Sequence, residues 1–120
     1  MGRINSAFFA RVNDFLAIYP ASIDSWYRTP ARNKAIGGAP NSYHVLGLAV
    51  DLIFDSLEDL FRGAYGARDM GFQGIEVDLT NKHLHLDGRE KSWHVVRTKY
   101  DGKIVTLQLS EYVFTPPTEV

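Results

Sequence analysis

The sequence predicts an α+β domain in which two main helices pack on a small, mainly antiparallel sheet. Two segments, 4–18 and 57–70, repeat apolar residues at the spacing of an amphipathic helix. The sequence from residue 74 to residue 109 is instead rich in short strand-like runs separated by turn residues. A chain of 120 residues is long enough for one domain with a core of its own.

The first helix is predicted over residues 4–18. Ile4, Phe8 and Val12 are spaced so that they share one face, and polar residues occupy positions between them. Pro20 ends the helix, because proline lacks a backbone donor and its ring clashes with the preceding helical turn.

Between the two helices, the sequence predicts two strands separated by a loop. Residues 22–28 alternate loosely and suit a short strand. Residues 29–42 are rich in Pro, Gly, Asn and Ala, and the tract 37–42 can neither hold a helix nor pack as a strand, so a loop is expected here. Residues 48–54 are apolar except for Asp51, which indicates a buried strand with one carboxylate in its middle.

The second helix begins at a pair that resembles a capping box, Ser56 and Asp59, and Gly71 is a natural stop for it. Asp101 and Gly102 lie between two alternating runs and are a strong signal for a hairpin turn. Four strands are therefore expected in this half of the chain, over residues 74–78, 83–87, 93–100 and 103–109.

The whole chain is expected to form one domain over residues 1–114, with a C-terminal tail over residues 115–120 and no oligomeric partner. The 13 Lys and Arg residues nearly balance the 14 Asp and Glu residues, so a net charge of −1 offers no general field for nucleic acid. No apolar run approaches the ~20 residues that span a bilayer, so membrane insertion is not expected. The chain has no cysteine, which excludes disulfides, thiolate nucleophiles and cysteine-ligated zinc.

The histidines indicate where a metal could bind. In a strand over residues 83–87, His83, His85 and Asp87 would point to the same face, because residues two apart share a face. Two imidazoles side by side are a good start for a zinc site. The alternative is the solvated face of an edge strand.

Asp51 supplies a second half of such a site. A carboxylate inside an apolar strand needs a compensating partner, which can be a metal ion, an arginine or a row of backbone N–H groups. His44 lies seven residues earlier, and Gly47 between them lets the chain turn from loop into strand. Together with one histidine from 83–87, these residues offer two nitrogens and one oxygen. Three protein ligands with an open fourth position are typical of catalytic zinc.

Two motifs in this order resemble those of the M15 metallopeptidases, which include D-Ala-D-Ala carboxypeptidases and related peptidoglycan peptidases, many of them phage endolysins. The first motif is Ser42-x-His44-x-x-Gly47-x-Ala49-x-Asp51. The second is His83-x-His85. The runs at 26–33 and 37–42 also resemble the stretch that precedes the first motif in that family, so that the resemblance covers roughly residues 22–89.

The resemblance implies a set of site residues. His44, Asp51 and His85 match the ligands of one Zn²⁺ per chain. Arg28 matches an active-site arginine that helps to bind and polarise the substrate, and Ser42 matches a position beside the substrate. The implied fold is like that of hedgehog and the D-Ala-D-Ala peptidases, with the zinc site on the sheet.

One position departs from the family pattern. The carboxypeptidase branch has an acidic general base three residues before the last ligand, where this chain has Lys82. Either His83 moves the proton, or a carboxylate does so, and the candidates are Glu76, Asp78 and Asp87. Asp87 shares a face with His85 and could instead orient that ligand.

The resemblance implies hydrolysis of peptide bonds in peptidoglycan stem peptides, with His83, Arg28 and Asp87 as the catalytic candidates. No secretory signal is evident at the N-terminus, so the protein is expected to stay in the cytoplasm until release, or to be carried by a phage, before acting on the cell wall. Two alternatives remain open. One is a zinc-containing binding domain that has lost catalysis, and the other is a metal-free structural domain of a phage particle.

Overall fold

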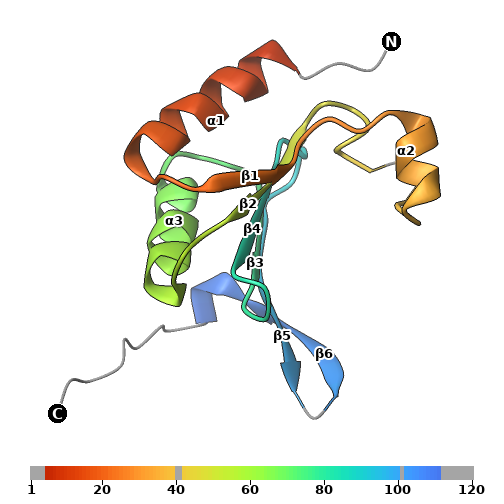
Figure 1. Ribbon diagram of the computed structural model, residues 1–120. Coiled ribbons are helices and arrows are strands. Elements are labelled where there is room, and N and C mark those ends of the chain that lie inside the picture. The colour runs from red at the N-terminus through yellow and green to blue at the C-terminus, as the bar shows by residue number, and fades with distance from the viewer. Residues whose placement is uncertain (1–4, 40–41, 101, 112–120) are drawn as a thin grey trace, which may run out of the picture.

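The computed structural model describes residues 5–39, 42–100 and 102–111, and the α+β class predicted from the sequence is confirmed. Three α-helices accompany one six-stranded sheet in the order β1-β2-β4-β3-β5-β6 (Figure 1). The elements are α1 (Ser6–Ile18), β1 (Ser22–Ser25), α2 (Pro30–Ala35), β2 (Ala49–Ile53), α3 (Leu57–Asp69), β3 (Gly74–Asp78), β4 (His83–Asp87), β5 (Trp93–Tyr100), β6 (Lys103–Gln108) and the short 3-10 helix η1 (Leu109–Glu111).

The predicted helices and strands form close to their expected bounds. Asn5 caps α1 by accepting a hydrogen bond from the backbone N–H of Phe8, over 3.0 Å. The expected start of this helix at residue 4 lies outside the described residues, as does the predicted tail over 115–120. None of the helices in the described part of the chain combines the length and apolar character needed to cross a bilayer.

The sequence predicts no helix in 29–36, where α2 forms, whereas the loop predicted for 37–42 lies after this helix. Thr29 is its N-cap and accepts from the backbone N–H of Arg32, while Pro30 occupies the first turn, where a missing N–H costs nothing. The expectation of two main helices is therefore incomplete. The additional short helix, α2, lies on the opposite side of the sheet from α1 and α3 (Figure 1).

The sheet is mainly antiparallel, as predicted, but it is mixed. Within the described residues only β3 and β5 pair in parallel. The central strand β4 lies between β2 and β3, and His85 is the direct partner of Asp51 on one side and of Glu76 on the other. At the far edge, Tyr100 pairs with Lys103 in the expected hairpin.

The two faces of the sheet have different chemistry. Alternate residues of the three central strands face α1 and α3 and are fully buried: Val50, Leu52, Ile75, Val77, Leu84 and Leu86. The intervening residues of the same strands point to the other face, and in β4 these are His83, His85 and Asp87. The apolar alternation thus fixes which side of the sheet carries the polar cluster.

Candidate metal centre

Asp51 and His85 meet because their strands are neighbours in register. Each lies in the middle of its strand, and the two are direct partners in the β2–β4 ladder, so both side chains point to the same face. The Oδ1 atom of Asp51 lies 2.8 Å from the Nδ1 atom of His85. The second-motif histidine and the first-motif carboxylate therefore meet as the sequence predicts.

His44 reaches the same carboxylate from the turn that precedes β2. Gly47 has a φ of 72°, a left-handed conformation that allows the chain to reverse between His44 and the strand. The Nε2 atom of His44 lies 3.0 Å from Oδ2 of Asp51, and the residue is only 4% exposed. Both oxygens of Asp51 thus face an imidazole nitrogen.

In each ring, the partner of the nitrogen that does not face Asp51 decides which nitrogen carries the proton when the ring is neutral. Nδ1 of His44 donates to the backbone oxygen of Trp26 over 2.7 Å, and Nε2 of His85 donates to Oδ2 of Asp87 over 2.7 Å. A carbonyl and a carboxylate can only accept, so in a neutral ring the nitrogen that faces Asp51 has a lone pair. In that neutral state lone pairs and carboxylate oxygens face one another, an arrangement that either a proton or a metal ion can bridge.

The three residues could hold a metal ion. One ligand atom from each of His44, Asp51 and His85 lies within 4.8 Å of the others. Zinc binds nitrogen and oxygen at about 2.0–2.2 Å, so ligand atoms around it lie within about 4 Å of one another, and the set needs only a small closure. Two imidazoles and one carboxylate leave a fourth position open, as catalytic zinc requires.

Electrostatics hold the set in a charged state without metal. Burial opposes ionisation of Asp51, but hydrogen bonds from His44 and His85 outweigh it and hold the pKa of Asp51 well below its ordinary value. Burial likewise opposes protonation of His85, yet its hydrogen bonds to Asp51 and Asp87 raise its pKa to about 9. A proton on His85 therefore occupies the nitrogen that a metal would use.

Asp87 lies behind His85 and is held by Arg89. The carboxylate is fully buried and accepts from the Nε and Nη2 atoms of Arg89 and from its backbone N–H. Burial alone would raise the pKa of Asp87, but the Arg89 guanidinium and His85 hold it well below its usual range. A Cβ atom at Gly74 would lie 1.8 Å from Oδ1 of Asp87, so only glycine leaves room for this carboxylate.

Arg28 and Ser42 lie around the His44 turn. The backbone N–H of Arg28 donates to the carbonyl of His44 over 3.1 Å, and Oγ of Ser42 accepts from the backbone N–H of His44 over 3.2 Å. The Nη1 atom of Arg28 donates to Oδ1 of Asn33, whose own Nδ2 donates to the carbonyl of Ala39. Arg28 Nε is buried and has no hydrogen-bond partner within the described residues.

The candidate bases occupy different surroundings. His83 and Glu76 both lie on the face that carries the metal ligands, and Glu76 is the direct strand partner of His85. Asp78 instead caps the turn between β3 and β4, where it accepts from the backbone N–H groups of Thr80 and Asn81. Lys82 is in the same turn with a φ of 55°.

Two residues near the site, Asn33 and Arg89, are not predicted from the sequence. Asn33 is 3% exposed and joins α2 to Arg28, but it lies in a helix that the sequence does not predict. Arg89 was not among the candidates, although it extends the alternating row of His83, His85 and Asp87 by one more step. That spacing is the signal that could have identified it.

Fold and site together define a small α+β protein with a His-Asp-His group on one sheet face that could hold a metal ion. The family model described as Peptidase M15 matches residues 5–87, which contain all three candidate ligands. The chain therefore belongs to the M15 peptidases, which are zinc enzymes. The resemblance stated from the two motifs is confirmed at the level of the family. No curated protein matches the chain.

Proposed function

We propose that this protein is a zinc-dependent peptidase that hydrolyses peptide bonds in peptidoglycan stem peptides containing D-amino acids. The observation that carries the proposal is the convergence of His44, Asp51 and His85 in a chain of the M15 family. The substrate class follows from the motifs that this sequence shares with the peptidoglycan enzymes. The protein would act on the cell wall as a monomer, after release from the cytoplasm or from a phage particle.

The chain supplies a complete ligand set. His44, Asp51 and His85 would hold the ion, and Asp87 and the carbonyl of Trp26 keep the two rings in the tautomers that ligation requires. Zinc, when bound, supplies an activated water and a Lewis acid for the scissile carbonyl.

His83 is the proposed general base. It lies two residues from His85 on the same face, and an imidazole can both take up a proton and return it. Glu76 is the rival carboxylate, because it lies beside His85 in the neighbouring strand. The contacts of Asp78 with its turn and of Asp87 with Arg89 favour structural and positioning roles for these two carboxylates.

Arg28 and Ser42 are the proposed substrate contacts. Arg28 has a buried Nε donor without a partner in the described part of the chain, and a guanidinium can stabilise a carbonyl oxygen or a developing oxyanion. Ser42 is adjacent to the His44 turn and partly buried. Each of these two residues contacts the backbone of the candidate ligand His44, and neither belongs to a strand of the sheet.

Zinc content and cleavage of defined wall peptides test the proposal together. We expect about one zinc per chain and release of new amino groups from purified stem peptides. Asp51→Asn should lose both, whereas the same change at Asp69, an exposed residue at the end of α3, should lose neither. Turnover that persists in a zinc-free Asp51→Asn protein would contradict the proposed chemistry.

A second candidate is a zinc-containing domain of the same fold that binds cell wall or belongs to a phage particle without cleaving. Lys82 favours it, because this position is acidic in the carboxypeptidase branch that the chain resembles. The Nζ atom of Lys82 donates to the carbonyl of Asp55 and offers no base. Stoichiometric zinc without turnover of any stem peptide would support this second function over the first.

A further inference from the structure

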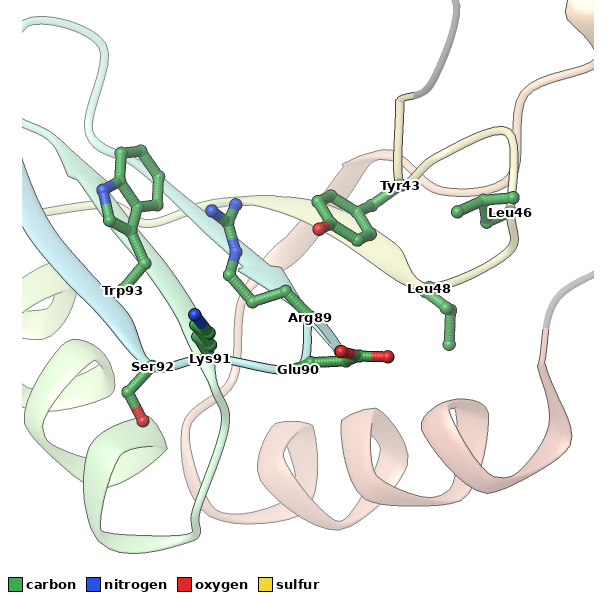
Figure 2. Close-up of a pocket in the computed structure, with 9 residues that line it drawn as sticks. Tyr43, Leu46, Leu48, Arg89, Glu90, Lys91, Ser92 and Trp93 are labelled. Carbon is green, nitrogen blue, oxygen red and sulfur yellow. The ribbon is translucent and has the colours of Figure 1, made fainter.

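A groove of about 550 Å³ opens beside the metal centre. The loop over residues 88–92, between β4 and β5, forms one side, and Trp93 stands at one end (Figure 2). Tyr43, Leu46 and Leu48, from the segment that carries His44, form the other side. The loop and Trp93 lie beyond the residues that the family model matches.

Arg89 is the central cation of this groove. Its guanidinium stands between the rings of Trp93 and Tyr43, with Cζ 4.4 Å and 5.0 Å from the two ring centroids (Figure 2). The side-chain hydrogen bonds to Asp87 use two of the five guanidinium N–H groups. The two rings flank the guanidinium, so the N–H groups that Asp87 does not use are the part suited to a ligand.

The two ends of the groove differ in polarity. Lys91 adds a second, exposed cation on the loop, while the carboxylate of Glu90 points toward Leu48 rather than toward Trp93 (Figure 2). Leu46 is 56% exposed and, with Leu48, makes the opposite end apolar. The groove thus combines donors for an anion with an apolar surface in the same lining.

Two contacts link the lining of the groove to the metal centre. Oδ2 of Asp87 accepts from both Arg89 and His85, so one carboxylate oxygen separates the groove cation from a metal ligand. Tyr43 is the residue before His44. Arg89 and Tyr43 thus tie the groove to His85 and His44, and the groove is a neighbouring surface for a peptide bound at the metal centre.

We propose that this groove is the subsite for a free carboxylate of the peptide substrate. The free N–H edge of Arg89, assisted by Lys91, binds the carboxylate, and the apolar part of the same residue contacts Leu46 and Leu48. Trp93 and Tyr43 hold the guanidinium in place by stacking. The inference rests on the proposed function, because it takes the occupant to be part of the peptide that is cleaved.

A matched pair of peptides tests the subsite. The full-length protein, after chelation of any bound metal, is titrated with acetyl-D-Ala-D-Ala and with its C-terminal amide, by calorimetry and by the fluorescence of the partly exposed Trp93. We expect the carboxylate form to bind about tenfold more tightly, the gain expected for one charge-assisted contact. Arg89→Gln should abolish this preference. Equal binding of the two peptides by the wild-type protein would overturn the proposal.

Further variants separate the subsite from the metal centre and from folding. Lys91→Gln, at an exposed residue, should reduce the preference about threefold, and the same change at the exposed Lys34 of α2 should leave it intact. Asp87→Asn should weaken zinc binding but preserve the preference, because Arg89 keeps its aromatic neighbours.

A preference retained in Arg89→Gln, or stronger binding of N-acetylglucosamine than of either peptide, would remove the carboxylate assignment. Since chelated protein and uncleaved peptides are used, failure of the peptidase itself would show only in turnover with zinc. Equal binding of the two peptides would leave the proposed peptidase standing.

Discussion

The Nε2–H of His85 donates to Oδ2 of Asp87 across 2.7 Å, and both residues lie on one face of β4. When His85 is neutral, this bond leaves Nδ1 unprotonated and facing Asp51, which is the tautomer that can ligate. The carboxylate that does this is itself fully buried and held by Arg89. The metal centre therefore depends on a series of contacts that runs from Arg89 through Asp87 to His85, and the first two of these residues are not candidate ligands.

Asp87→Asn tests that chain. The amide can present an N–H to His85 and no longer carries the charge that stabilises its ring orientation, so zinc affinity should fall by about 10–100-fold. Competition with a chromophoric chelator measures the change. The same substitution at the exposed Asp69 is the control and should leave the affinity as it is. Unchanged affinity in Asp87→Asn would show that His85 needs no partner.

Gly74→Ala tests the space around Asp87. The added Cβ would meet Oδ1 at 1.8 Å, and neither the buried carboxylate nor the strand can move freely, so we expect a loss of about 1–3 kcal/mol in the free energy of unfolding together with weaker zinc binding. At Gly88 the nearest atom to a new Cβ is 3.4 Å away, and Gly88→Ala should have little effect. Chemical denaturation measures both variants. Similar stability losses in the two would contradict the steric account.

The stability of the metal-free protein should depend on pH through His85. Its pKa rises on folding from 6.5 to about 9, so its stabilising contribution is complete below pH 6.5 and is lost as the pH rises through 9. The lowered pKa values of Asp51 and Asp87 act at the other end, where stability is lost as the pH falls below about 3.8. The free energy of unfolding should therefore be largest between about pH 3.8 and pH 6.5.

Denaturant titrations between pH 3 and pH 10 measure this profile. The decline above pH 6.5 should vanish in His85→Gln, which cannot take up the proton. Saturation with zinc should also remove it, because the metal replaces that proton on Nδ1. A decline of equal size in all three samples would assign the pH dependence to another group.

Arg28→Ala should reduce turnover strongly without loss of zinc, because Arg28 contacts the His44 turn through its backbone rather than through a ligand side chain. Arg32→Ala, at an exposed residue of α2, is the matched control. The measurements are zinc content, kcat and KM on a defined stem peptide. Unaltered kinetics would remove Arg28 from the substrate site, and loss of zinc would give it a structural role in the turn.

The sequence predicts local elements and faces better than it predicts long-range partners. Alternation over residues 83–87 reveals which side chains share a face, because that depends only on strand geometry. The helix over Pro30–Ala35 escapes notice because its capping signal lies among glycines and prolines. The parallel pairing of β3 with β5 depends on the order of strands in the finished sheet, which no local pattern specifies.

The same limit explains which site residues were found. The ligands could be recognised because the two motifs are local, whereas the stack of Arg89 with Tyr43 joins segments 46 residues apart. Only folding brings such partners together. A lone arginine after a glycine carries no sign of the aromatic ring that it will contact.

His83 and Glu76 make opposite predictions as general base. If His83 moves the proton, His83→Ala keeps its zinc, because the ring is not among the three ligands, and loses about 10²–10⁴-fold in kcat. Glu76→Gln, which removes a charge beside His85 and Arg97, should then change kcat by much less. Rates on a defined stem peptide and zinc content decide between them. Full activity in His83→Ala, together with a large loss of kcat in Glu76→Gln, would show that Glu76 is the general base. The proton would then be moved by the carboxylate that pairs with His85 from the neighbouring strand.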